Sequence, residues 1–231
     1  VFNTTGSTAC LHADWPMYRA DASRSGISRE SIKFPLSLQW HFSPRHKPRP
    51  AWPDPVKERH RLDFDYAPQL IVAAGTVYFG TSVDDTLFAL DAKTGRKNWA
   101  FTTGGPIRFA PACFEGRVYV ASDDGFLYCL RAVTGELLWK FHAADTRSLV
   151  LGNERLISRR PLRSGVLVDR GVVFVTAGMW PSEGVLIYAL EAATGEVHWC
   201  NDTSDTRYLA QPHAKASSLT GVSPQGYLLA T

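Results

Sequence analysis

The 231-residue sequence lacks long hydrophobic runs and clustered metal-binding or nucleophilic residues, and each absence excludes a class of protein. No stretch approaches the roughly 20 consecutive apolar residues of a membrane-spanning helix, so we expect no transmembrane span. The seven histidines are scattered, with no nucleophile motif and no metal-ligand spacing. Neither a hydrolytic triad nor a metal centre is therefore predicted. The four cysteines also stand alone in the sequence, at Cys10, Cys113, Cys129 and Cys200.

The sequence also lacks a large excess of charge of one sign. Its 25 Lys and Arg against 22 Asp and Glu give a formal net charge of +3, and basic residues are interleaved with acidic ones. No basic groove studded with aromatic residues and no nucleic-acid motif is visible, so no nucleic-acid partner is expected. The hydrophobic content of 45% and charged content of 20% are ordinary for a globular chain.

What the sequence does contain is one phrase repeated three times, over residues 89–99, 129–139 and 189–199. Each copy follows a short apolar run rich in strand formers, passes through Thr-Gly and ends at tryptophan. The glycines supply the positive φ of a hairpin turn. The repeated glycines and tryptophans are Gly95, Gly135, Gly195, Trp99, Trp139 and Trp199. A second recurring hairpin precedes each phrase, so the repeat predicts a unit of four antiparallel strands.

The repeated phrase resembles the tryptophan-docking motif of quinoprotein (pyrroloquinoline quinone, PQQ) β-propellers. In that family the tryptophan of the outermost strand packs flat between neighbouring blades. Ala, Thr, Gly and Trp stand at the expected offsets in two copies, and Cys129 replaces the alanine in the other. The resemblance covers residues 14–231 and implies an all-β propeller of four-stranded antiparallel blades, eight in the full-length protein. Its first strand, at residues 36–42, is expected to close the ring as the outer strand of the last blade.

The repeats predict about three complete blades, at residues 66–101, 109–141 and 163–200, and the first hairpin of a fourth at residues 225–231. Because propellers typically need about four to eight blades to close, we expect the chain to be a fragment that packs against the remaining blades. Residues 1–13 are interpreted as a signal-peptide remnant or a tail. Residues 14–65 hold the ring-closing strand and a basic, proline-rich loop, and residues 66–231 hold the blades.

Variable connections mark the predicted binding face. The separation of the two marker glycines is nearly constant inside each repeat, but it varies between repeats, so insertions lie between one blade and the next. In a four-stranded propeller these inter-blade connections and the turns between second and third strands emerge on one face. We call it the connection face; it comprises the inter-blade connections of residues 43–65 and 142–163, the connection that holds Arg108, and the turns that hold Asp84-Asp85, Asp123-Asp124 and residues 179–184. Insertions confined to one face are typical of a binding surface.

Arginines fill the inter-blade connections, and acidic residues fill the turns between second and third strands. One hypothesis is that Arg108, Arg155 and others brace the loops by pairing with these acids, since the planar guanidinium suits carboxylates. The other hypothesis leaves some arginines free for an anionic ligand, such as quinone carboxylates, sulfated or uronic sugars, or an acidic strand of a partner. The candidate ligand-face residues are Asn153, Glu154, Arg155, Arg159, Arg160, Trp180, Arg108 and Asp124.

Three segments that hold these candidates have two interpretations each. In the stretch of residues 150–161, residues 153–155 offer an amide, a carboxylate and a guanidinium, which could bind a polar ligand or a hard cation. The other interpretation of this stretch is a helical turn that caps the ring. Asp123 and Asp124 form a carboxylate pair that could ligate calcium, or they belong to an ordinary Asp-Asp-Gly turn. The Trp180 ring either stacks on a planar ligand or packs against its own loop.

The resemblance includes both enzymes and non-enzymes. The family's PQQ-dependent dehydrogenases hold the quinone between a tryptophan and a vicinal disulfide, with calcium or a lanthanide bound by Glu and Asn beside a catalytic Asp. No two cysteines are adjacent here, and Cys113 and Cys129 fall on non-neighbouring strands of one blade, too far apart for a disulfide. No catalytic residue and no metal ligand is assigned, and PQQ with calcium stays an open cofactor hypothesis.

Non-enzymatic relatives include the propeller lipoprotein of the outer-membrane β-barrel assembly machinery. We therefore interpret the chain as a non-catalytic binding or scaffold module of the bacterial cell envelope, periplasmic or at the cell surface. Its expected partners are an envelope protein, a peptide or an anionic polysaccharide. The alternatives are a quinoprotein oxidoreductase whose cofactor residues lie partly in other blades, and the sensory ectodomain of a larger signalling protein.

Overall fold

The structure of the chain is a computed structural model that describes residues 14–28, 30–51, 65–143, 148–152, 154–180, 184–203, 207–210, 217–222, 224 and 226–231. These residues form an all-β fold without helices, as the sequence predicts. A search of the same residues for a helix long and apolar enough to cross a membrane finds none.

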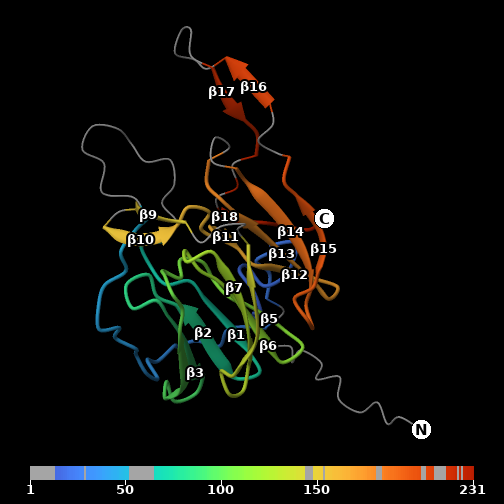
Figure 1. The fold of residues 1–231 in the computed structure, drawn as a ribbon. Helices are drawn as coiled ribbons and strands as arrows, with labels where there is room; N and C mark the ends of the chain where they lie inside the picture. Colours follow the sequence, from blue (N-terminus) through green and yellow to red (C-terminus); the bar gives the residue numbers. More distant parts are fainter. Residues whose placement is uncertain are drawn as a thin grey trace.

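Three four-stranded antiparallel sheets form the body of the molecule (Figure 1). Blade 1 consists of β1 (Leu70–Ala73), β2 (Thr76–Gly80), β3 (Thr86–Asp91) and β4 (Lys97–Thr102). Blade 2 consists of β5 (Ala112–Phe114), β6 (Arg117–Ala121), β7 (Phe126–Arg131) and β8 (Leu137–His142). Blade 3 consists of β12 (Leu167–Asp169), β13 (Val172–Ala177), β14 (Leu186–Glu191) and β15 (Val197–Asn201). In each blade neighbouring strands are consecutive in sequence, which confirms the predicted four-stranded unit.

The residue that begins each Thr-Gly turn determines which polar contacts stabilise the turn. The Asp91 carboxylate accepts hydrogen bonds from the backbone N–H groups of Thr94 (2.7 Å) and Lys93 (3.1 Å). Arg131 occupies the same position in blade 2 and cannot accept such bonds, so its Nε instead pairs with Glu136 at 2.8 Å. In each blade the register between the third and fourth strands shifts at the same point, one residue after Ala89, Cys129 or Ala189.

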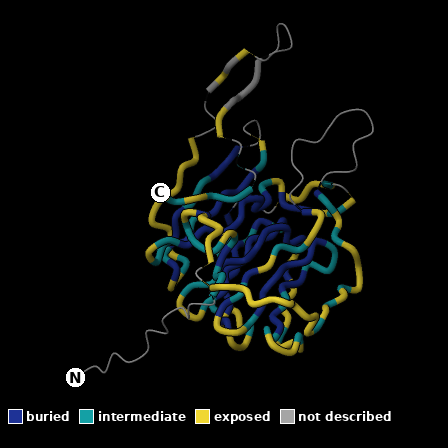
Figure 2. Tube along the Cα trace, turned by 180° about the vertical axis from the view of Figure 1, so that it is seen from behind, coloured by how far each residue is buried: buried dark blue, intermediate teal, exposed yellow. Residues whose placement is uncertain are grey.

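The core lies between the flat faces of adjacent blades (Figure 2). Tyr119, Leu127 and Cys129 of blade 2 belong to one buried cluster with Val173 and Leu190 of blade 3. Burial raises the pKa of the Cys129 thiol to about 12, so this cysteine stays protonated. Cys113 on β5 and Cys129 on β7 are both free thiols, as expected for non-neighbouring strands.

The tryptophan of one blade lies against the Thr-Gly turn of the next blade. A Cβ atom at Gly135 would stand 2.7 Å from the Trp99 ring, and the indole N–H of Trp99 donates to the Ala132 carbonyl at 2.9 Å. Trp139 has the same relation to Gly195 and donates to Ala192 at 3.3 Å. Each contact therefore needs a residue without a side chain at the turn.

The N-terminal segment supplies the corresponding contact for blade 1. Trp40 lies against Gly95, and its indole N–H donates to the Ala92 carbonyl at 3.0 Å. Trp40 thus takes the place on blade 1 that Trp99 takes on blade 2. Trp199 of blade 3 contacts Phe174 and is 48% exposed.

Alanine substitutions at two glycines, Gly135 and Gly116, distinguish the energetic cost of backbone strain from the cost of steric overlap. Gly135 and Gly116 have nearly the same φ, +73° and +72°, but a Cβ at Gly116 would meet nothing within 4 Å. We expect Gly116→Ala to cost about 1 kcal/mol through left-handed strain alone. Gly135→Ala should cost roughly 1–3 kcal/mol more, because its Cβ overlaps Trp99. Chemical denaturation of both variants measures the difference, and equal losses would show that Trp99 does not constrain the turn.

Six further strands, two hairpins and one parallel pair, occupy the same end of the molecule as the connection face (Figure 1). They are β9 (Leu149–Gly152) paired with β10 (Arg155–Ser158), β16 (Arg207–Ala210) paired with β17 (Ser217–Thr220), and β11 (Ser164–Gly165) paired with β18 (Gly226–Tyr227). The β9–β10 hairpin lies in the connection between blades 2 and 3, where the spacing of the repeats predicts an insertion.

The C-terminal segment differs from the predicted hairpin of a fourth blade. β18 pairs in parallel with β11, and no antiparallel partner for it is present among the described residues. The Tyr227 ring stacks on Tyr18 with centroids 3.6 Å apart and fills the space over Gly165, where any Cβ would overlap it. Its hydroxyl accepts a hydrogen bond from the Ala110 N–H at 2.7 Å. Burial of this aromatic ring decides the course of the segment, so the hairpin prediction for residues 225–231 was wrong in its pairing.

Candidate functional site on the connection face

Two arginines and two aspartates meet beneath the connection face, at the junction of the three blades. Arg108 comes from the connection between blades 1 and 2, and Asp123 comes from the turn between β6 and β7. Arg163 precedes blade 3, and Asp65 precedes blade 1. We call these four residues the arginine–aspartate cluster. Their side chains are only 1–3% exposed.

Asp123 is the centre of the arginine–aspartate cluster. Its carboxylate accepts from Arg108 Nε at 2.6 Å and from Arg163 Nε and Nη2 at 3.1 and 3.0 Å. Arg108 Nη1 also donates to Asp65 at 2.5 Å and to the Arg49 carbonyl at 2.9 Å. Two positive and two negative charges therefore neutralise one another, and Arg108 donates hydrogen bonds through both Nε and Nη1.

The electrostatics of the cluster favour its fully charged state. Burial opposes ionisation of Asp123, but the guanidinium groups of Arg163 and Arg108 outweigh it and lower the pKa of the carboxyl. Burial likewise opposes the charge on Arg108, yet Asp123 and Asp65 raise its pKa above the ordinary value. The cluster is therefore an internal set of ion pairs at neutral pH, and its guanidinium charges are already compensated.

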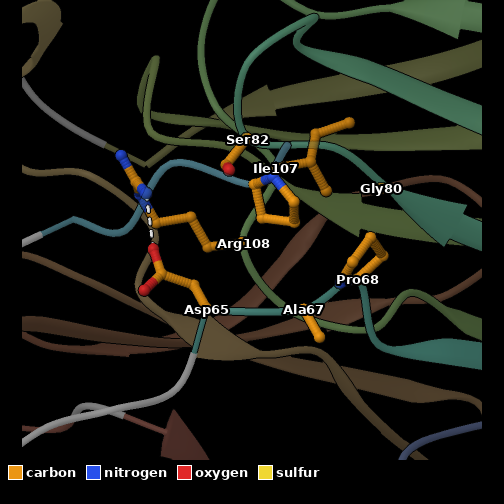
Figure 3. Close-up of a pocket in the computed structure, with 8 residues that line it drawn as sticks. Asp65, Ala67, Pro68, Gly80, Ser82, Ile107 and Arg108 are labelled. Carbon is orange, nitrogen blue, oxygen red and sulfur yellow. Dashed lines mark hydrogen bonds and ion pairs between the residues drawn. The ribbon is translucent and has the colours of Figure 1, made fainter. Parts of the chain in front are cut away.

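A small hollow lies beside this cluster. It is lined by Pro48, Asp65, Ala67, Pro68, Gly80, Ser82, Ile107 and Arg108. Figure 3 shows Arg108 and Asp65 joined by their ion pair at the hollow, with Ser82 nearby. The N-terminal loop approaches here, since the Arg49 N–H donates to Ser82 Oγ at 2.9 Å and the Ala51 N–H donates to Asp65 at 2.7 Å. The described part of the basic, proline-rich loop thus lies against blade 1.

The β9–β10 hairpin forms a strap across the connection face. Arg155 pairs with Asp85 and donates to the Val83 carbonyl at 2.9 Å, both in the β2–β3 turn of blade 1. The N–H of Ser158 donates to the Asp123 carbonyl at 2.7 Å in blade 2. Glu154, at the hairpin turn, pairs with Arg49. The hairpin is therefore held to two blades and to the N-terminal loop.

The alternative of a helical turn at residues 150–161 is wrong. Residues 149–152 and 155–158 pair as antiparallel strands, with Leu156 opposite Leu151 and Ile157 opposite Val150. Glu154 has a φ of 64°, which turns the chain at the end of the hairpin. Apolar residues on both strands favour this pairing, and Ile157 is buried beneath it.

The seven predicted site residues that the structure describes fall into three groups, and the eighth is not described. Arg108, Arg155 and Glu154 are engaged in ion pairs, so the predicted bracing of loops by arginine and acid is present. Asp124 accepts from the Gly104 and Phe126 N–H groups and from the Tyr128 hydroxyl, at 2.7, 2.9 and 2.6 Å, which are the contacts of a turn residue. Arg159 and Trp180 are exposed, and Arg160 is partly buried. Asn153 lies outside the described residues.

Three members of the arginine–aspartate cluster were not among the predicted site residues. The sequence predicts Asp65 and Arg163 only as charged loop residues, and Asp123 only as a neighbour of Asp124 in a turn or a calcium-binding pair. The available signal was positional, because each stands directly before a blade or in a turn of the same face. Among the residues that the structure describes, no group of three or more His, Cys, Asp or Glu side chains could hold a metal ion.

Three four-stranded blades that pack face to face, with tryptophan against glycine at each boundary, define a propeller of the quinoprotein class. The family described as outer membrane protein assembly factor BamB matches residues 39–160, which is more than half of the 231 residues, and the chain belongs to that family.

The quinoprotein ethanol dehydrogenase of Pseudomonas putida is 27% identical over 166 residues, which cover 66% of this chain and 25% of that protein. The serine/threonine-protein kinase AfsK of Streptomyces griseus is 29% identical over 136 residues, 56% of this chain and 15% of the kinase. The crystal structure of the quinohemoprotein alcohol dehydrogenase from Comamonas testosteroni superimposes with a TM-score of 0.62 at 21% identity, over 82% of this chain and 27% of that one. The matches thus span 15–27% of the length of these proteins, and the structural likeness supports the fold.

The described residues do not fit a quinone site. Bound PQQ carries carboxylates, which need uncompensated cationic donors, and both buried arginines of the connection face already pair with Asp65 and Asp123. An added anion here would face Asp65 and Asp123 as well as the two guanidinium groups. The sequence holds no adjacent cysteines either.

Proposed function

We propose that this chain is part of a non-catalytic propeller module of the bacterial cell envelope, which binds a protein or an anionic ligand through its connection face. The observation that carries the proposal is the arginine–aspartate cluster. It joins the connections of all three blades by buried ion pairs, and it builds a rigid frame instead of an open reactive pocket.

Membership of the family named for an outer-membrane assembly factor supports a location in the periplasm or at the cell surface. A rigid frame under variable loops is the usual arrangement of a binding surface. Because the frame is already ordered, little binding free energy is lost to ordering it when the partner binds. The exposed side chains above the frame, on the β9–β10 hairpin and at Arg159, are then the contact residues.

A PQQ-dependent oxidoreductase is the alternative. The 27% identity with the quinoprotein ethanol dehydrogenase of Pseudomonas putida favours it, and under this alternative the residues that contact the quinone lie in other blades. The two functions make opposite predictions for quinone binding.

Titration of the protein with PQQ in the presence of calcium, followed by absorbance and calorimetry, tests the proposal. We expect no saturable quinone binding and no dye-linked alcohol oxidation in a folded sample. Stoichiometric binding would overturn the proposal in favour of the oxidoreductase. Asp65→Asn is a control for the explanation that compensated arginines exclude the quinone carboxylates. It leaves one guanidinium charge of the cluster uncompensated and should increase affinity for small anions.

A further inference from the structure

The β9–β10 hairpin presents a row of leucines to solvent. Leu151 and Leu156 lie opposite each other in the hairpin and share one face with Leu149, since side chains two residues apart point the same way. These three leucines are 75%, 63% and 58% exposed. On the other face Ile157 is buried against the body and Arg155 is tied to blade 1. The exposed face is therefore the one turned away from the blades.

One edge of this hairpin is open. Among the strands in the described part of the chain, β9 pairs with β10 and with no other strand. Its outer edge accordingly presents backbone N–H and C=O groups that an extended segment can pair with. An open edge beside an apolar face is the arrangement used when a peptide adds a strand to a sheet.

The hairpin is already ordered before any partner binds. Arg155 and Glu154 fix its tip through Asp85, the Val83 carbonyl and Arg49, and the N–H of Ser158 fixes its base. Exposed leucines on a loosely held loop would collapse onto the protein, whereas this strap keeps them outward. A partner therefore loses little of its binding free energy to ordering the hairpin.

The charges around the hairpin select the partner. The described acidic residues of the connection face are engaged within the protein: Asp65 and Asp123 in the cluster, Asp85 and Glu154 with arginines, Asp84 with His46, and Asp124 with backbone and Tyr128. Arg159, next after β10, is exposed, and no carboxylate among the described residues pairs with it. The uncompensated surface is apolar and basic, and it complements an apolar and acidic one.

We propose that the outward face and open edge of the β9–β10 hairpin bind an extended, acidic peptide segment of a partner protein. Its alternate apolar side chains pack on Leu149, Leu151 and Leu156, its backbone pairs with β9, and its carboxylates lie near Arg159. The inference rests on the proposed function, since it names the partner class of the same face.

A labelled peptide tests this inference directly. The probe is a fluorescent peptide of about eight residues that alternates leucine and glutamate, matched by a peptide with lysine in place of glutamate, and binding is read from fluorescence anisotropy. We expect saturable binding of the acidic peptide and none of the basic one. The double variant Leu151→Ser/Leu156→Ser should bind at least about tenfold more weakly, and Arg159→Gln should weaken binding and reduce its salt dependence.

Val133→Ser is the matched control, because Val133 is an exposed valine in the Thr-Gly turn of blade 2. It should leave binding unchanged, and thermal unfolding should show that the leucine variants fold normally. Equal binding of both peptides, no binding of either, or an unaffected leucine double variant would overturn the inference. Self-association that the leucine substitutions abolish would also overturn it, in favour of a second copy of the chain as occupant. Quinone binding, by contrast, would overturn the proposed function while leaving the peptide result to stand separately.

Discussion

Replacement of Asp123 by alanine is expected to lower the free energy of unfolding by about 3–5 kcal/mol, because it leaves buried guanidinium groups without their central carboxylate. Arg163 would lose its paired aspartate, and Arg108 would keep only Asp65 and a carbonyl oxygen. Chemical denaturation monitored by tryptophan fluorescence measures the loss. Glu136→Ala is the matched control, since it breaks the exposed pair with Arg131 and should change stability little.

The pH dependence of the same variant checks the cause. The folded state lowers the pKa of Asp123, so its contribution is fully present above the pKa of an unfolded aspartate, about 3.9, and is lost as the pH falls through the lower folded value. The difference in stability between the native protein and Asp123→Ala should therefore be constant near neutrality and shrink in acid below about pH 4. A difference that grew on acidification would contradict the ion-pair explanation.

Trp139→Ala is expected to destabilise the protein by about 3–5 kcal/mol, because it opens a cavity between blades 2 and 3. The indole packs over Gly195, lies 5.9 Å from the Tyr119 ring and donates to the Ala192 carbonyl. Equilibrium unfolding in urea measures the loss. Trp199→Ala provides the matched control, since Trp199 holds the same place in the repeated phrase but is 48% exposed.

Trp199→Ala should cost clearly less than Trp139→Ala. Losses of equal size would mean that the indole stabilises its own blade and not the boundary to the next one. A loss below about 1 kcal/mol for Trp139→Ala would contradict the register assigned to the blades.

The blades were predictable because their signals are local. Thr-Gly turns and apolar runs recur at nearly constant spacing, and both the strand limits and the turn geometry depend on residues within a few positions. The departure at Arg131 was predictable for the same reason, since an arginine cannot accept a backbone hydrogen bond.

The presence of ion pairs at the site was predictable, but which arginine pairs with which aspartate was not. Arginines in one set of loops and acids in another indicate ion pairs, yet Arg163 meets Asp123 across 40 positions and Arg108 meets Asp65 across 43. Those partners depend on how three blades come together, which no local pattern records. The choice among equally plausible acids therefore required the structure.

Two short segments were predicted wrongly for different reasons. The apolar residues of 149–158 form runs too short for periodicity to separate a helical turn from a strand. At the C-terminal segment the turn-like Gly226 favoured a hairpin, but the Tyr227 ring found burial against Tyr18 and over Gly165. Long-range burial of one ring outweighed the local turn signal.

The indole contacts run in one direction along the chain, from Trp40 onto blade 1, from Trp99 onto blade 2 and from Trp139 onto blade 3. Each blade is thus clamped at its turn by the unit before it. Such an assembly behaves as a one-dimensional series of nearest-neighbour couplings, in which the stability of any blade includes a share from its predecessor. Damage to one boundary then weakens both units that share it and leaves the other boundaries in place, so the propeller opens one boundary at a time.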